Sequence, residues 1–274
     1  MEDLEELEEL IGERGLSQHR DAILATARPA ILIFLDERTG RSGAGHRGGA
    51  GERYGQSRIG GVPDLPESLP WPEDSTGRTR LAFLLQINFS ELPVFAGTPF
   101  PRRGMLYLFG GADGENMGRV MVYTGSEPLL PTDPPSGKPY TDHGYDDLVP
   151  HRLGFQVAPD VPRWATRDFY ALCESLGPEY EGEYEYEDAL HDLGNTLSAG
   201  AVGKLLGHLS GIGYDPREHM AAEDAVDWIN LLQVESDDEV NVCFSDAGYL
   251  QVLVHPEALE QLDFSRAYVS LESS

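Results

Sequence analysis

The sequence predicts a mainly β protein of the α+β class: a duplicated β-rich unit forming one compact two-part domain, with N-terminal helices and short connecting helices. The chain has 274 residues, of which 40% are hydrophobic, enough to fill a core. Short apolar segments bounded by Gly, Pro, Asp or Ser recur along it, as is typical of strands. Several of these segments in the first half also match segments in the second half.

Four pairs of matching segments carry this internal repeat. They are residues 58–61 with 204–207, 84–87 with 231–234, 104–109 with 248–253, and 119–122 with 266–269. The spacing within the pairs stays between 144 and 147 residues, and the order is the same in both halves. We therefore expect a first β-rich repeat over residues 58–150 and a second over residues 204–274.

The segments outside the repeats have other patterns. Residues 1–35 predict two helices, the second from Ser17 to Ala27, which lead into a first strand from Ala30 to Leu35. Residues 36–57 form a glycine-rich loop, and residues 151–203 are predicted to be an acidic helical connector. The remaining helices are expected over residues 166–176, 187–193, 221–227 and 256–262.

Two glutamines stand at equivalent places in the repeat. Gln86 and Gln233 each lie within an apolar strand segment, and a buried amide must find hydrogen-bond partners there. They are candidates for a paired polar feature where the halves meet. The alternative is that each ties down a neighbouring loop. Trp71, in a proline-rich loop, is a further binding candidate.

Charge is the strongest compositional signal. With 47 acidic and 20 basic residues, the net charge of −27 repels phosphate backbones, which excludes nucleic acid as an expected ligand. Residues 168–192 carry nine carboxylates and no Lys or Arg. They form either a solvated face or a docking surface for a basic protein. The candidate binding residues in this run are Tyr180, Glu183, Tyr184, Glu185 and Tyr186.

The compartment follows from what the sequence lacks. The apolar runs are much shorter than the roughly 20 residues that a membrane-spanning helix needs. The acidic N-terminus differs from a secretory signal, and the two cysteines, Cys173 and Cys243, are too few for a disulfide framework. We therefore expect a cytoplasmic protein without a membrane segment.

Motifs of catalysis and of cofactor binding are weak. The glycine-rich loop lacks the Lys-Ser/Thr of a phosphate-binding loop, so no cofactor is predicted. The nearest approach to a metal cluster, Asp142 to His151 followed by Asp215 to His219, is better explained by chance in a chain so rich in carboxylates, and no metal site is predicted.

Three motifs of the first half carry a resemblance to a known family. They are residues 57–63 (SRIGGVP), 69–72 (LPWP) and 81–88 (LAFLLQIN), and residues 231–233, 236–238, 246–248 and 263–265 add a second-half pattern. In these motifs the chain resembles the bacterial YwqG-like family. The resemblance implies a largely β architecture with a duplicated unit and no agreed activity.

Three functions remain open. The first is a non-enzymatic binding protein whose acidic surface takes a basic protein partner, in a regulatory or toxin-neutralising role. The second is a metal-dependent hydrolase with a cleft between the repeats, lined by Gln86, Gln233 and Asp246. The third is a module that binds a small ligand or a glycan through Trp71 and the tyrosines.

Overall fold

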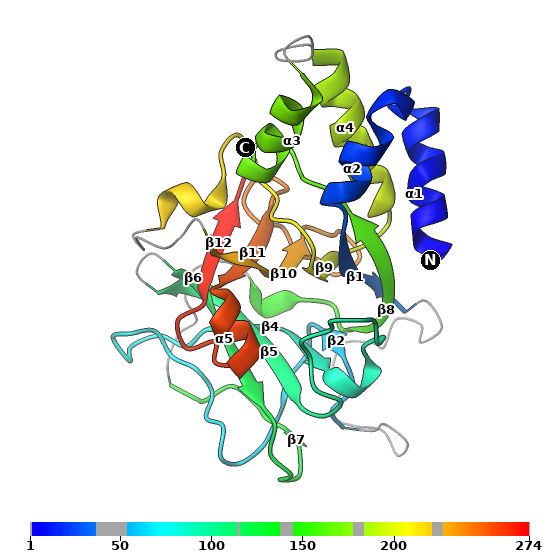
Figure 1. Cartoon of the computed structure of the whole chain (residues 1–274). Coiled ribbons are helices and arrows are strands. Elements are labelled where there is room, and N and C mark those ends of the chain that lie inside the picture. Colours follow the sequence, from blue (N-terminus) through cyan, green and yellow to red (C-terminus); the bar gives the residue numbers. More distant parts are fainter. Residues whose placement is uncertain are drawn as a thin grey trace.

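The computed structural model describes residues 2–36, 54–113, 116–137, 145–177, 184–220 and 227–273. In these ranges the chain forms one large sheet with helices gathered mainly above it (Figure 1). The strands are β1 (Arg28–Leu35), β2 (Arg58–Ile59), β3 (Asp64–Leu65), β4 (Ala82–Asn88), β5 (Met105–Asp113), β6 (Asn116–Tyr123), β7 (Leu130–Pro131), β8 (His151–Asp160), β9 (Gly203–Leu206), β10 (Ile229–Glu235), β11 (Tyr249–Val254) and β12 (Tyr268–Glu272). The α-helices are α1 (Glu2–Glu13), α2 (Arg20–Thr26), α3 (Arg167–Leu176), α4 (Tyr184–Leu197) and α5 (Pro256–Gln261). Single 3-10 turns lie at Ser17–His19, Phe89–Glu91, Tyr145–Asp147 and Pro216–His219.

The main sheet is antiparallel throughout the described residues, and its strand order is β12-β11-β10-β9-β1-β8-β2-β4-β5-β6. The long strands β1 and β8 pair at its centre. On one side follow four strands from the second half of the chain, and on the other side four strands from the first half. The prediction of a mainly β fold with a few helices is confirmed.

Each of the matched segments overlaps a strand of this sheet. The first pair lies on β2 and β9, next to the central strands, and the second on β4 and β10. The third lies on β5 and β11, and the fourth on β6 and β12 at the two ends. The four strands of each side therefore succeed one another outward from the centre in the same sequence order.

The two ends of the sheet lie against each other. Asn116 Oδ1 at the start of β6 accepts a hydrogen bond of 2.8 Å from the backbone N–H of Val269 in β12. A single apolar core joins the sides, in which Leu84 and Leu108 belong to the same buried cluster as Leu232 and Val252. Because burial of apolar side chains is the main stabilising term, this shared core holds both sides as one body.

The helices α1 to α4 form a layer with its own core at one end of the sheet (Figure 1). Leu7 of α1, Phe169 of α3 and Leu193 of α4 are completely buried in it. Thr166 caps α3, as its Oγ1 accepts from Phe169 N at 3.3 Å. The expected helices over residues 166–176, 187–193 and 256–262 are confirmed, whereas most of residues 221–227 and of the glycine-rich loop lie outside the described residues.

Residues 151–160 differ from the expectation of a helical connector over residues 151–203. They form β8, which pairs with β1 along eight residues from Arg28–Asp160 to Leu35–Leu153. The alternating Leu153, Phe155 and Val157 are a strand pattern, although Gly154 and Pro159 within it are residues that strands disfavour. The helical part of this segment, α3 and α4, begins only after β8. Among the described residues, no helix combines the length and the apolar character needed to cross a membrane.

Candidate functional site

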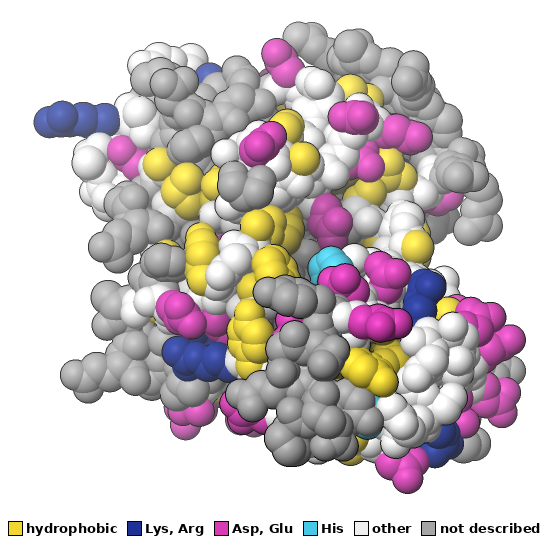
Figure 2. Space-filling model, turned by 90° about the horizontal axis from the view of Figure 1, so that it is seen from above, with side chains coloured by type: hydrophobic (Ala, Val, Ile, Leu, Met, Phe, Trp, Pro, Cys, Tyr) yellow, Lys and Arg dark blue, Asp and Glu magenta, His cyan; other side chains and the backbone are white. Residues whose placement is uncertain are grey.

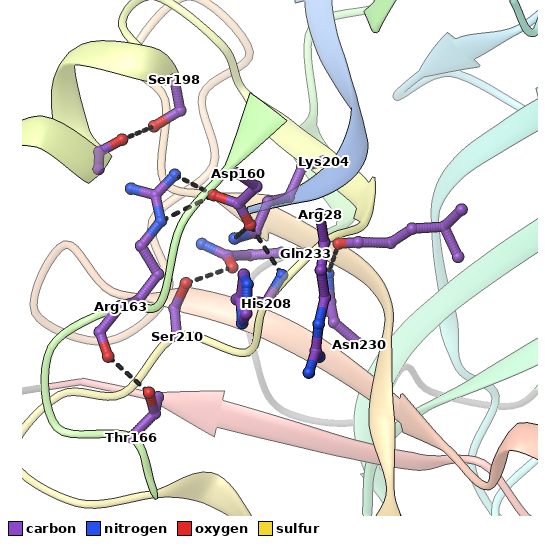
Figure 3. Close-up of polar contacts among 12 residues, drawn as sticks. Arg28, Asp160, Arg163, Thr166, Ser198, Lys204, His208, Ser210, Asn230 and Gln233 are labelled. Atoms are coloured by element: carbon purple, nitrogen blue, oxygen red, sulfur yellow. Dashed lines mark hydrogen bonds and ion pairs between the residues drawn. The ribbon is translucent and has the colours of Figure 1, made fainter. Parts of the chain in front are cut away.

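A buried ion cluster lies where the carboxyl end of β8 meets β9 (Figure 3). Asp160, 1% exposed, accepts from Arg163 Nε and Nη2 at 3.0 and 2.7 Å on Oδ1. On Oδ2 it accepts from Lys204 Nζ at 2.7 Å and from His208 N at 2.8 Å. Burial alone would raise the pKa of Asp160, but Arg163 and Lys204 hold it well below its ordinary value. The carboxylate therefore stays ionised and joins β8, β9 and the turn after β9.

The turn after β9 has a geometry that brings the backbone close to this carboxylate. Leu206 and Gly207 both have positive φ, 63° and 72°. A Cβ at position 207 would lie 2.4 Å from Asp160 Oδ2, so glycine is required there both for its backbone and for its lack of a side chain. The same turn in the first half, after β2, has φ values of 71° and 75° at Gly60 and Gly61.

Beside the ion cluster lies a cavity of about 520 Å³, which we call the Lys204 cavity. Its volume is within the roughly 300–1,000 Å³ of small-molecule sites. The walls come from β9 to β11, from the loop after β9, from the residues after β8 and from the end of α4. They are Arg163, Trp164, His191, Asn195, Ser198, Ala199, Gly200, Ala201, Gly203, Lys204, Ser210, Gly211, Ile212, Gln233, Glu235 and Tyr249.

The sheet side of the cavity is polar. Gln233 Nε2 donates to Glu235 Oε1 at 3.1 Å, and Gln233 Oε1 accepts from Ser210 Oγ at 2.9 Å. Burial raises the pKa of Glu235, while Arg163 and Lys204 limit the rise. Burial also lowers the pKa of Lys204 to about 8, against the attraction of Asp160. The cavity therefore holds an acid and a base whose environments oppose their charged forms.

Tyr249 adds a hydroxyl group that is not satisfied. Its oxygen is buried and has no hydrogen-bond partner in the described part of the chain. Burial, with the negative charges of Glu272 and Glu235, raises the pKa of Tyr249, so the hydroxyl keeps its proton. A buried hydroxyl without a partner costs about 1–3 kcal/mol, and a bound molecule that pairs with it would recover that cost.

Trp164 and His191 lie on the opposite wall. Their rings meet edge to face, with centroids 6.2 Å apart, and 40% of Trp164 is exposed although Arg163 and Ala165 on either side are buried. Ala165 has a φ of 59°, a left-handed conformation that costs a residue with a Cβ on the order of 1–2 kcal/mol. Backbone strain of this kind gathers at functional sites, and here it lies next to a residue of the cavity wall.

The first half of the chain has a related set of polar side chains around Arg58 and Gln86, in which a carboxylate, that of Asp64, lies between them. Asp64 lies six residues after Arg58, as Ser210 lies six residues after Lys204. The Asp64 carboxylate accepts from Arg58 Nη1 at 2.7 Å, from Gln86 Nε2 at 3.0 Å and from Gly55 N at 2.7 Å. Ser210 has no carboxylate to fill the corresponding place in the second half, and there it lines the cavity.

The predicted glutamines do not meet. Gln86 binds the loop beside it, since its Nε2 donates to Gln56 O at 2.7 Å and its Oε1 accepts from Asp64 N at 2.8 Å. This is the alternative of a glutamine that ties down a loop. Gln233 lines the Lys204 cavity, and among the predicted site residues that the structure describes it is the one that does so.

The other predicted residues lie elsewhere. Trp71 packs edge-on against Phe109, with centroids 5.2 Å apart, and its Nε1 donates to Leu81 O at 2.8 Å. Asp246 is exposed in a turn, where its backbone N donates to Ser273 Oγ at 3.0 Å. Neither residue lines the cavity.

The acidic run is described only in part. Tyr180 and Glu183 lie outside the described residues, and Tyr184 is described only as the first residue of α4. Glu185 is exposed, and the half-buried Tyr186 packs its ring edge-on to His19, with centroids 6.1 Å apart. Tyr186 therefore serves the packing of the helical layer.

No group of three or more His, Cys, Asp or Glu side chains that could hold a metal ion occurs among the described residues. Of the carboxylates considered for such a site, Asp215 accepts from Arg217 Nε at 2.9 Å and from Arg167 N at 2.9 Å. Asp142 and His143 lie outside the described residues. The Lys204 cavity has one carboxyl group, Glu235, and one imidazole, His191, on its wall, fewer than the three or four ligands that a metal site needs.

Of the residues that line the cavity, Lys204 is the one that the sequence most clearly marks as a candidate site residue. The chain has only two lysines, and this one stands between glycine and two leucines, in a strand segment with no acidic neighbour. A lysine buried in a strand needs a partner from elsewhere, which is a sign of a site. Trp164 and His191 carry no such signal, because their positions depend on how α3 and α4 pack.

One comparison places the chain among known sequences. The model of a domain of unknown function, DUF1963, matches residues 57–272. The match includes every strand of the main sheet except β1. It also includes every residue that lines the Lys204 cavity. No curated protein shows a significant match to the chain. The chain belongs to the DUF1963 family.

Proposed function

We propose that this protein binds a small polar molecule in the Lys204 cavity. The observation that supports the proposal best is Tyr249, a residue of the cavity wall whose buried hydroxyl lacks a partner in the described part of the chain. Polar groups on a cavity wall that the protein does not satisfy itself are the groups that orient a ligand. The binding is non-enzymatic in this proposal.

We also infer that the chain is a duplicated unit. The same strand succession on both sides of the central pair β1 and β8 supports this, as do the matching positive-φ turns at Gly60–Gly61 and Leu206–Gly207. Under this proposal, the units run over residues 58–150 and 204–274, and only the second unit keeps its space open. We further propose that the chain is related to the YwqG-like family and that it is located in the cytoplasm.

A cavity-filling variant tests the proposed function. Ser198 lies just after α4, and its Oγ makes only hydrogen bonds of 3.4 Å to Gly194 O and Asn195 O. Ser198→Trp should place a ring in the cavity and abolish binding. Ser175→Trp is the matched control, because Ser175 is exposed near the end of α3 and does not line the cavity.

The measurement is a thermal-shift and calorimetric survey of sugars, amino acids, nucleotides and polyamines with the wild type and both variants. Binding of any class that is lost in Ser198→Trp and kept in Ser175→Trp supports the proposal. Binding that both variants retain, or no binding by the wild type, contradicts it.

A second function is supported by the charge of the helical layer. Exposed acidic residues outnumber exposed arginines on the described parts of α1, α3 and α4. They are Glu5, Glu6, Glu9 and Glu13 on α1, Glu174 on α3, and Glu185, Asp188 and Asp192 on α4. Figure 2 views the molecule from this side and shows acidic side chains in greater number than basic ones. We propose this face as a docking surface for a basic protein.

Charge variants on two helices test the docking surface. Asp188→Asn with Asp192→Asn should weaken the binding of a cationic helical peptide and reduce its dependence on salt. Glu257→Gln with Glu260→Gln is the control on α5, which lies apart from the helical layer (Figure 1). Equal effects of both double variants, or binding that does not change with salt, would count against a defined surface.

A further inference from the structure

We propose that the molecule bound in the Lys204 cavity is an uncharged, polyhydroxylated one of the monosaccharide class, an inference that rests on the proposed function. Three features of the cavity argue for it: the balance of charge on its walls, the mixture of donors and acceptors, and the indole of Trp164.

The charges on the walls balance without a ligand. The positive groups are Arg163 and Lys204, and the negative groups are Asp160 beneath them and Glu235 beside them. Arg163 already uses Nε and Nη2 on Asp160, and Lys204 gives one bond to the same carboxylate. A phosphate or carboxylate ligand would therefore meet cations that are already paired. The net charge of −27 on the chain also opposes an anion.

The polar groups of the wall that have hydrogen-bonding capacity left require a ligand that both donates and accepts hydrogen bonds. The Tyr249 hydroxyl has no partner among the described residues, and Lys204 Nζ has three hydrogens, of which one is bound to Asp160. Glu235 accepts on Oε1 from Gln233 Nε2. A carboxyl group and an ammonium group on one wall are satisfied together by neighbouring hydroxyl groups, since each hydroxyl donates once and accepts twice.

Trp164 provides the apolar complement. Trp164 is 40% exposed, and its ring packs edge-on against that of His191. The C–H face of a sugar ring is apolar while its edge is polar, so one molecule can contact the indole and the polar wall together. A nucleotide would bring negative charge that this wall does not balance.

The experiment compares ligand classes and three variants by calorimetry and tryptophan fluorescence. The probes are glucose, galactose, mannose and ribose, with glutamate, lysine and adenosine monophosphate as charged alternatives. We expect the wild type to bind at least one of the sugars. Trp164→Ala should weaken that binding at least about tenfold, and Tyr249→Phe about fivefold. Tyr170→Ala, which removes an exposed aromatic ring on α3 away from the cavity, should leave it unchanged.

The outcomes separate the two proposals. Sugar binding lost in Ser198→Trp and weakened in Trp164→Ala supports both. Binding of a charged probe alone, if Ser198→Trp abolishes it, overturns the sugar assignment and leaves the proposed function standing. Sugar binding that neither variant affects overturns the assignment to this cavity. If no probe binds in a way that depends on Ser198, both proposals fail.

Discussion

Lys204 Nζ lies 2.7 Å from Asp160 Oδ2, and both side chains are almost completely buried, at 3% and 1% exposed. The pair joins β9 to the end of β8, two strands that are separated in the sheet by β1. Taking two charges out of water is costly, and only their attraction and the further hydrogen bonds from Arg163 and His208 offset that cost. The first two predictions concern this pair.

Removing the lysine should destabilise the fold. Lys204→Met leaves Asp160 with one of its two cations, and breaking a buried pair in this way should lower the free energy of unfolding by about 3 kcal/mol. Urea denaturation at neutral pH measures the loss. The control is Arg20→Met, because Arg20 is exposed and pairs with Glu8 at the surface, where little change is expected. A loss no larger than that of the control would show that the buried pair is not stabilising.

Acid should weaken the fold through the same carboxylate. The folded pKa of Asp160 lies below the ordinary value of 3.8, so between the two values the unfolded chain binds more protons than the folded one. The stability that Asp160 contributes is therefore fully present above about pH 4 and falls as the pH falls further. Unfolding curves between pH 5 and pH 2 should show a smaller slope for Asp160→Asn than for the wild type. Equal slopes would contradict the assignment of this loss to Asp160.

Glu235 should show the opposite dependence. Burial raises its folded pKa above the ordinary 4.5, so its contribution to stability is present below pH 4.5 and is lost as the pH rises through the folded pKa. Glu235→Gln removes the buried charge and keeps an oxygen for Gln233 Nε2. The variant should be more stable than the wild type at pH 7, and the difference should shrink at pH 4. Thermal unfolding at the two pH values checks this, and a variant that is less stable at pH 7 would contradict it.

Two tyrosines should respond differently to the loss of their hydroxyl groups. Tyr107 OH donates to Asp64 O at 2.7 Å in the buried interior, whereas Tyr249 OH has no partner among the described residues. Tyr107→Phe should therefore cost about 1 kcal/mol of unfolding free energy, and Tyr249→Phe should be neutral or stabilising. Denaturant unfolding of the two variants side by side tests the contrast. Equal losses would mean that the Tyr249 hydroxyl is satisfied in the folded protein.

The strands that carry the matched segments are the part of the fold that the sequence predicted best. The four segment pairs fall on β2 and β9, β4 and β10, β5 and β11, and β6 and β12, because short apolar runs between turn residues are a local signal. The missing element was β8, whose alternating Leu153, Phe155 and Val157 are interrupted by Gly154. Its place at the centre of the sheet depends on pairing with β1, which lies more than 100 residues earlier.

The candidate site was predicted only through Gln233. Gln86 and Gln233 each follow two leucines and precede a β-branched residue, yet one binds its own loop and the other lines a cavity. The difference comes from Asp64, which fills the first place with a carboxylate, and from Ser210, which does not. The sequence does show that an aspartate at position 64 corresponds to a serine at position 210. Whether this difference opens a cavity depends on which groups the fold brings near each glutamine.

The sequence by itself determined the mainly β class, the places of the matched strand segments along the chain and the acidic character of the chain, because these follow from composition and from patterns a few residues long. Only the tertiary structure decided where the Lys204 cavity lies. Its walls come from the residues after β8, from β9 and the loop after it, from β10, β11 and the end of α4, and the ion pair of Asp160 and Lys204 joins residues 44 positions apart. Contacts over such separations arise from packing of the whole core, and no local pattern encodes them.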